Sequence, residues 1–296
     1  MSRRTWMMSG TAFLVTAFVV APAAARDDDN PSAVRIGLVK TLFRDVPEAL
    51  IPIGLRPMKE LMLGQTGVNG DLIPLGDADS LARQLKAGEV QLAVFHGVEF
   101  AWVHQNYPTL KPLVIAVNEH PFLRAHLVVR TDSKMVGGAD LKGKVVNLAR
   151  NQDHCRLFLE RRCCPTGENA AAFFSAEPVQ WCAEDALDNV LDDADQAAVV
   201  DETTLEAYRK SKPGCAAKLK TISQSETFPC GVIAYQPGAL SDATLTTFRD
   251  GLIAAKNSTK AQKLLKSNHL TGFEAVPSDY EQMLLDIAKA YPAVAK

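Results

Sequence analysis

The stretch GEVQLAVFHG, residues 88–97, carries the clearest fold signal in the chain. Its core, Val90–Phe95, is apolar apart from one glutamine, which predicts a short strand covered on both faces of a sheet. Gly88 ends the helix expected before this strand, and the polar pair His96 and Gly97 follows its last residue. A buried strand with one helix before it and another after it is the repeating unit of α/β folds.

The same alternation extends in both directions from this stretch. Strands are predicted at residues 35–39, 71–75, 113–117, 126–129, 144–148, 179–181, 196–200, 219–222 and 231–235, with helices between many of them and at 241–256, 260–267 and 278–290. A helix over residues 50–63 is expected to be broken or kinked by Pro52 and Pro57. No Pro/Gly/Ser linker interrupts this pattern, so we predict an α/β fold of two lobes, each a mostly parallel sheet flanked by helices.

Composition excludes some function classes. The chain has 296 residues, of which 47% are hydrophobic and 22% charged, and its formal net charge is −2. This is an ordinary globular balance that supports two cores. A protein that binds nucleic acid usually carries a basic stripe with interleaved aromatic residues, and the sequence shows none, so no nucleic-acid partner is expected.

The first 25 residues indicate export. Arg3 and Arg4 are followed by an apolar run, Trp6–Val20, and then by an Ala-x-Ala site ending at Ala25. This predicts a signal peptide over residues 1–25 and a periplasmic mature protein. The alternative is a membrane anchor, which the run is rather short to form.

Export changes the interpretation of the cysteines. The chain has six, all between residues 155 and 230, and thiols in an oxidising compartment tend to pair. Six cysteines allow 15 complete pairings. We favour Cys163 or Cys164 with Cys182, and Cys215 with Cys230. A zinc site is the alternative, although the usual Cys-x-x-Cys spacing is missing.

Ligands of open α/β sheets bind beyond the carboxyl ends of the strands. The rule selects four loops, residues 40–43, 96–99, 151–154 and 201–203. The residues expected at the ligand are Thr41, Leu42, Phe43, His96, Gly97, His126, Asn151, Gln152, His154 and Asp201.

Four segments carry a family resemblance. Residues 88–97 resemble the G-x-[VI]-D-[IL]-A-x-F-G element of the phosphate, phosphite and phosphonate binding proteins of ABC transporters. Residues 127–147 are similar to that family's V-V-x-x-D-S and D-L-K-G-K-x-V elements, residues 197–201 to D-A-A-x-V-D, and residues 277–280 loosely to V-x-D-x-D-Y. Together they span almost all of the mature chain.

The resemblance implies a type II periplasmic binding protein fold, with a ligand cleft between two lobes. Lobe 1 is expected at residues 33–129 plus 236–296, and lobe 2 at 130–235. It also implies a monomer that captures a small anionic solute and delivers it to an ABC permease in the inner membrane, with no cofactor, no metal and no enzymatic activity.

One segment departs from the family. After the predicted strand at 144–148 the family has a Ser-Thr-Ser-type turn that holds the phosphonate oxygens, whereas this chain has Ala149–His154, without hydroxyl groups. Asn151, Gln152 and a protonated His154 can still donate hydrogen bonds to an oxyanion. The identity of the anion is therefore open at this point.

Two other functions are compatible with the sequence. The same scaffold could serve a membrane signalling partner as a ligand sensor. His154 and Cys155 could also indicate a hydrolase, but neighbouring residues of a helix do not face each other, so a direct dyad is not expected. An acidic run at residues 184–195 lacks the pattern of a calcium loop and is expected to be a solvated helix face.

Overall fold

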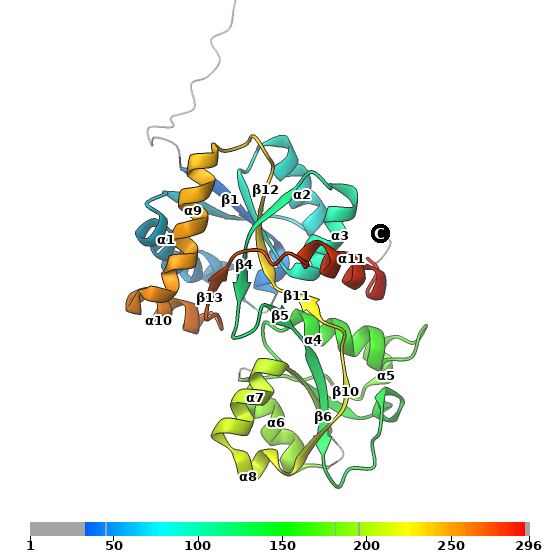
Figure 1. Cartoon of the computed structure of the whole chain (residues 1–296). Helices are drawn as coiled ribbons and strands as arrows, with labels where there is room; N and C mark the ends of the chain where they lie inside the picture. Colours follow the sequence, from blue (N-terminus) through cyan, green and yellow to red (C-terminus); the bar gives the residue numbers. More distant parts are fainter. Residues whose placement is uncertain (1–32, 45, 181, 195, 294–296) are drawn as a thin grey trace, which may run out of the picture. The chain divides into compact units, whose positions relative to one another are not determined.

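The computed structural model describes residues 33–44, 46–180, 182–194 and 196–293, which form one compact unit. The predicted signal peptide at 1–25 lies outside the described residues. The chain forms two large sheets and one two-stranded sheet (Figure 1).

The first sheet has the order β13-β4-β12-β3-β1-β2. Its strands are β1 (Val34–Leu38), β2 (Gly70–Pro74), β3 (Leu92–Phe95), β4 (Lys111–Val117), β12 (Gly231–Tyr235) and β13 (Gly272–Glu274). The strand predicted from residues 90–95 lies inside this sheet, between β1 and β12. Leu92 and Phe95 in it are fully buried, as expected for a strand covered on both faces.

The second sheet has the order β10-β6-β9-β7-β8. Its strands are β6 (Ala125–Arg130), β7 (Val145–Ala149), β8 (Val179–Gln180), β9 (Gln196–Asp201) and β10 (Leu219–Gln224). A small sheet of β5 (Phe122–Leu123) and β11 (Phe228–Pro229) forms where the chain crosses between the two large sheets.

Both large sheets are mixed, which corrects the expectation of mostly parallel sheets. In the first sheet β12 is inserted between β3 and β4 and runs antiparallel to both. In the second sheet β6 is antiparallel to β9 and to β10. These two strands are the ones that enter each sheet directly after a crossing from the other. They therefore run opposite to the strands that βα units join within a lobe, such as β1 and β3.

The lobe boundaries stay a prediction, and the sheets show where the crossings lie. Residues 125–129 pair in the second sheet and residues 231–235 in the first. Each crossing thus falls about one strand earlier than the expected boundary at 129/130 or 235/236. A buried apolar strand looks the same in sequence whichever sheet it joins.

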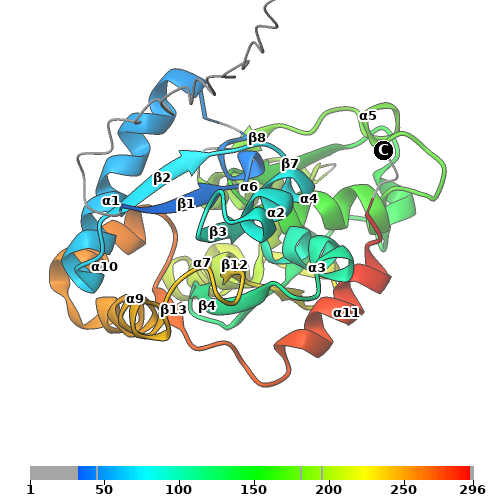
Figure 2. The ribbon, with the colours of Figure 1, turned by 90° about the horizontal axis from the view of Figure 1, so that it is seen from above.

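Helices cover both faces of the first sheet (Figure 2). One face packs against α1 (Ile51–Thr66), α9 (Asp242–Ala254), η5 (Ala255–Asn257) and α10 (Thr259–Ser267). The other packs against α2 (Ala78–Ala87), α3 (Gly97–Asn106) and α11 (Tyr280–Ala290). The short turns η1 (Lys40–Phe43) and η2 (Glu48–Leu50) lead into α1.

The second sheet is likewise covered on both faces. Its first layer contains η3 (Gly138–Leu141), α4 (Asp153–Phe158), the π-helical turn η4 (Leu159–Cys163) and α5 (Ala170–Phe173). The opposite layer contains α6 (Ala183–Asp192), α7 (Glu202–Ser211) and α8 (Pro213–Ala216).

The helix α1 is continuous, although a break or kink was expected at its prolines. Pro52 lies in its first turn, where a backbone N–H has no partner within the helix, so proline is tolerated there. Pro57 lies inside the helix without ending it. Gly67, with φ 67°, ends α1 in the left-handed conformation.

The six cysteines are free thiols, which corrects the expected pairing. Cys163 and Cys164 are buried in the second lobe's core, whereas Cys182 is exposed. Cys215 packs with the α6–α7 layer, whereas Cys230 belongs to the core of the first sheet. Cys215 and Cys230 thus lie with the cores of different sheets.

Candidate functional site

One cavity of about 510 Å³ lies where the strands of both sheets end. Its lining includes residues that follow β1, β3, β7 and β9, namely Leu42 and Phe43, His96 and Gly97, Asn151 and Gln152, and Asp201. These are the loops that the strand-end rule selects. The fold thus brings together four segments that are as far as 160 residues apart in the chain.

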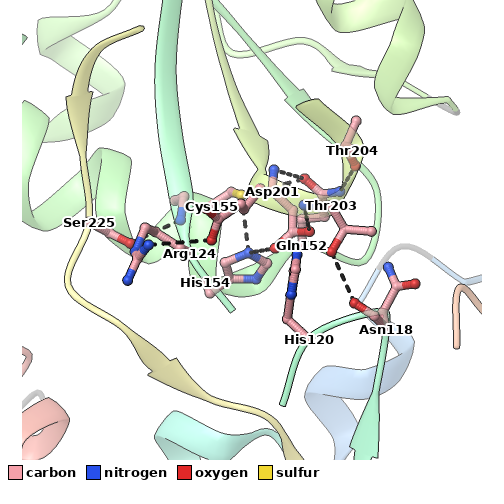
Figure 3. A network of polar contacts seen from close by, with 12 residues as sticks. Asn118, His120, Arg124, Gln152, His154, Cys155, Asp201, Thr203, Thr204 and Ser225 are labelled. Carbon is pink, nitrogen blue, oxygen red and sulfur yellow. Dashed lines mark hydrogen bonds and ion pairs between the residues drawn. The ribbon is translucent and has the colours of Figure 1, made fainter. Parts of the chain in front are cut away.

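Asp201 is a buried carboxylate of this cavity, and both of its oxygens have a partner (Figure 3). It caps α7, because its Oδ1 accepts a hydrogen bond from the backbone N–H of Thr203 at 2.9 Å. Its Oδ2 lies 3.0 Å from Nε2 of His154. Burial opposes ionisation, but the contact with His154 and the bond from Thr203 hold the pKa of Asp201 below its usual value. The Asp201 carboxylate is therefore charged, and its contacts with His154 and Thr203 already stabilise the negative charge.

Gln152 ties the two loops of the second lobe to each other. Its Oε1 accepts from the backbone N–H of Asp201 at 3.2 Å, and its Nε2 donates to Oγ1 of Thr204 at 3.2 Å. Thr203 in turn donates to the backbone carbonyl of Asn118 at 3.0 Å, which connects this network to the end of β4 (Figure 3). Gln152 therefore has a positioning role within the loop pair.

His154 and Cys155 do meet, contrary to the expectation for adjacent helical residues. The Cys155 Sγ lies 3.4 Å from Nε2 of His154. The same Nε2 faces Asp201, however, so a proton on it that is donated to Asp201 leaves no lone pair to accept the thiol proton. Burial also raises the pKa of Cys155 well above its usual value, and the nearby Asp201 adds to this. Since the nucleophile of a Cys/His enzyme is a thiolate, this geometry disfavours the hydrolase hypothesis.

Asp153 links the second lobe to the first through two ion pairs. Its Oδ2 lies 3.1 Å from Nε2 of His96, which begins α3, and its Oδ1 lies 3.1 Å from Nε of Arg44. Burial alone would lower the pKa of His96, but Asp153 and Glu99 raise it above its usual value. Despite burial, His96 and Arg44 hold the pKa of Asp153 below its usual value. The negative charge of Asp153 is therefore also stabilised by its own partners, His96 and Arg44.

The side-chain hydroxyl of Thr41 points toward the carboxylate of Glu99. Its hydroxyl lies 2.8 and 2.9 Å from the two carboxylate oxygens of Glu99, to which it donates a hydrogen bond. Burial raises the pKa of Glu99. Thr41, Glu99 and His96 line a smaller pocket of about 80 Å³ beside the main cavity. Thr41 is thus adjacent to the cavity lining without belonging to it.

Eight of the ten predicted residues line the cavity: Leu42, Phe43, His96, Gly97, Asn151, Gln152, His154 and Asp201. Packing also requires a glycine at position 97, because a Cβ there would overlap the backbone carbonyl oxygens of Pro229 and Cys230. Asn151 adopts a positive φ of 57°, which asparagine tolerates better than most residues.

His126 does not line the cavity. It shares a face of β6 with Val128, which packs in the α6–α7 layer, because alternate residues of a strand point to the same side. Both ring nitrogens of His126 are buried without a hydrogen-bond partner, and burial lowers its pKa.

The cavity also contains polar residues that are not among the ten predicted ones: Asn118, Arg150, Asp153, Thr204, Asn268 and His269. Asn118 directly follows β4, so the strand-end rule could have selected it. Asn268 and His269 come from the loop between α10 and β13, and no local sequence signal marks them as cavity residues.

Within the described part of the chain, no group of three or more His, Cys, Asp or Glu side chains is placed to hold a metal ion. Among the same residues no helix has the length and apolar character needed to cross a membrane.

One protein-family model matches most of the chain. Residues 52–280 match the family described as "ABC transporter, phosphonate, periplasmic substrate-binding protein". No curated protein sequence matches the chain.

Solved structures show a similar fold at low sequence identity. XAC2383 from Xanthomonas citri, bound to ATP, has a TM-score of 0.56 and 15% identity over 88% of this chain and 97% of that chain. PhnD1 from Prochlorococcus marinus in complex with methylphosphonate has a TM-score of 0.56 and 13% identity over 88% and 98%.

A third structure is the binding protein component of an ABC phosphonate transporter from Pseudomonas aeruginosa, PA3383. Its TM-score is 0.52, with 17% identity over 87% of both chains. At this identity the structures establish the fold, and the family match establishes membership. The chain belongs to the phosphonate family of periplasmic substrate-binding proteins and is the solute-binding component of an ABC transporter.

Proposed function

We propose that the cavity captures a small oxyanion of the phosphonate, phosphite or phosphate class, and that the loaded protein delivers it to an ABC permease in the inner membrane. We further propose that the protein acts as a monomer and reaches the periplasm through the signal peptide at residues 1–25. The family match supports the transporter role, and PhnD1, a protein of similar fold, is known with methylphosphonate.

The observation that carries the proposal is the set of hydrogen-bond donors at the strand ends. Asn118, Arg150, Asn151 and His269 line the cavity there, from both sheets. The two carboxylates at this end, Asp153 and Asp201, are compensated by their own partners and so repel an anion less. Amide and guanidinium groups can replace the hydroxyl donors of the family's Ser-Thr-Ser turn, because charge-assisted bonds to an oxyanion need only a donor in reach.

Thermal unfolding tests the capture step. A ligand at one hundred times its dissociation constant stabilises the folded state by about 2.7 kcal/mol, which corresponds to a rise of roughly 5 to 11 °C in Tm for a chain of this size. We expect methylphosphonate, phosphite or phosphate to produce such a rise in phosphate-free buffer. If none of the three anions changes the Tm, oxyanion capture is refuted.

A pair of variants locates the binding site. Asn151→Gly removes the side-chain amide but keeps a backbone conformation that glycine adopts freely. Loss of one hydrogen bond to a charged ligand costs about 1.5–3 kcal/mol, so the affinity should fall about ten- to hundredfold. Glu119, with φ 65°, lies outside the cavity lining, and Glu119→Gly is the matched control that should bind like the wild type. Equal affinity of both variants would place the anion elsewhere.

A further inference from the structure

The cavity continues from the polar strand ends onto an apolar face of the first sheet. We name this part the apolar chamber. It is lined by Ile51, Gly54, Leu55, Met58 and Met62 of α1, Leu72 of β2, Val94 of β3, Leu252 of α9, and Leu270 and Phe273 near the C-terminal strand. None of these residues is charged.

The sheet is incompletely covered in this chamber. Leu92 and Val94 lie on the same face of β3, a strand inside the first sheet. Leu92 is fully buried, whereas Val94 is only partly buried, although it is just two residues nearer the strand end. A valine of an internal strand is normally covered by the helix layer. Here α1 covers one part of the face and leaves the other open to the cavity.

The helix α1 faces this opening with one side. Its lining residues have the spacing i, i+3, i+4, i+7 and i+11, which is one stripe of an α-helix. Gly54 is the second residue of the stripe and contributes no side chain. It is exposed, and a Cβ built there meets no atom within 4 Å, so this position of the lining has room for a side chain.

The volume exceeds what a bare oxyanion requires. About 510 Å³ lies within the range of roughly 300–1,000 Å³ that is typical of sites for drug-sized ligands. A four-oxygen anion bound at the polar end would leave the apolar lining in contact with water, which is unfavourable in proportion to the uncovered area. The complementary ligand is one with an apolar body attached to its charged group.

We propose that the protein recognises amphiphilic oxyanions, in which a phosphonate-type head binds at the strand ends and an alkyl or aryl body fills the apolar chamber. This inference rests on the proposed capture of an oxyanion and specifies the class of ligand. Burial of one methylene group contributes about 0.8 kcal/mol, which is a factor of about four in the dissociation constant.

A series of n-alkylphosphonates, from methyl to decyl, tests the inference by calorimetry on the purified protein. We expect the dissociation constant to fall up to about fourfold per methylene group and to level off when the chamber is full. Equal affinity along the whole series would overturn the apolar-body inference and leave oxyanion capture intact.

Two glycine variants of the same helix provide the matched comparison. Gly54→Leu adds a side chain at a position that lines the chamber, whereas Gly64→Leu adds one at a position of α1 outside the cavity lining; both glycines are exposed, so the variants are matched. We expect Gly54→Leu to weaken the binding of hexylphosphonate much more than that of methylphosphonate. Gly64→Leu should bind both ligands like the wild type. Equal behaviour of the two variants would refute the role of the chamber.

If no alkylphosphonate of any length binds, oxyanion capture fails, and a second probe still decides on the chamber. The fluorescent anion 1-anilinonaphthalene-8-sulfonate combines a different acidic head with an aromatic body. We expect it to bind with enhanced fluorescence to the wild type and to Gly64→Leu, and much less to Gly54→Leu. Equal fluorescence of all three proteins would overturn the inference.

Discussion

The ion pairs of Asp153 give a prediction whose size can be worked out from the structure. Asp153 begins α4 in the second lobe, and its two partners, His96 and Arg44, follow strands or turns of the first sheet. Asp153→Asn keeps the shape of the side chain and removes the charge. It therefore removes the electrostatic part of a contact between two halves of the fold and little else.

The magnitude follows from the exposure of the partners. The side chains of Asp153 and His96 are 18% and 24% exposed, whereas that of Arg44 is 47% exposed. Exposed ion pairs contribute about 0–1 kcal/mol, and breaking a fully buried pair costs about 3–5 kcal/mol. The pair with His96 lies between these limits, and the pair with Arg44 is largely screened by solvent. We expect Asp153→Asn to lower the free energy of unfolding by about 1–2 kcal/mol at pH 6.

The effect should depend on pH in a defined direction. The pKa of His96 is raised in the folded protein, so its contribution is complete below the ordinary value of 6.5 and is lost as the pH rises through the folded pKa. The pKa of Asp153 is lowered from 3.8, so its contribution is lost only as the pH falls through that lower value. Between these limits both groups are charged. The cost of Asp153→Asn should therefore be larger at pH 6 than at pH 9, where the pair with Arg44 alone remains.

Urea unfolding followed by circular dichroism at pH 6 and pH 9 measures this difference directly. Asp132→Asn is a suitable control, because Asp132 forms an ion pair with Arg130 at 2.7 Å and no histidine takes part in it. Its effect should not change between the two pH values. A cost of Asp153→Asn that is the same at pH 6 and pH 9 would show that a charged His96 does not stabilise the fold through Asp153.

Two further substitutions test the packing around the cavity. Gly97→Ala should lower the free energy of unfolding by about 3 kcal/mol, since overpacking against backbone is costly and the new Cβ would overlap the carbonyl oxygen of Pro229; an unchanged Tm would contradict this. His126→Leu should leave ligand affinity unchanged and raise stability, more at pH 5.5 than at pH 8, because burial lowers the pKa of His126 and the unfolded chain binds the proton first. Weaker ligand binding would contradict the placement of His126 outside the cavity, and a lower Tm at pH 5.5 would contradict a pKa of His126 that burial lowers.

The sequence predicts the loops of the site well because the rule behind them is topological. Buried strands such as Val90–Phe95 are visible as apolar runs, and the residues after them must meet at one edge of a sheet. Strand direction is not visible in this way, since an apolar run looks alike in either direction. The antiparallel strands β6 and β12 were therefore not foreseen. Placement of His126 depended on the same missing information, because which layer a strand residue faces is set by its register with β9.

The apolar chamber escaped the sequence for a different reason. The stripe from Ile51 to Met62 is the pattern of an amphipathic helix, and this pattern is the same whether the apolar side packs on a sheet or lines a cavity. Only Gly54 breaks it. A glycine inside a helix costs about 1 kcal/mol relative to alanine, and a helix selected for packing alone would gain from a side chain at this position. A glycine at this position is explained if the ligand occupies the space that the missing side chain leaves, since natural proteins give up stability where function requires it. On this reasoning Gly54→Ala should stabilise the protein while reducing the volume available to the ligand, so the position couples the stability of α1 to what the cavity can hold.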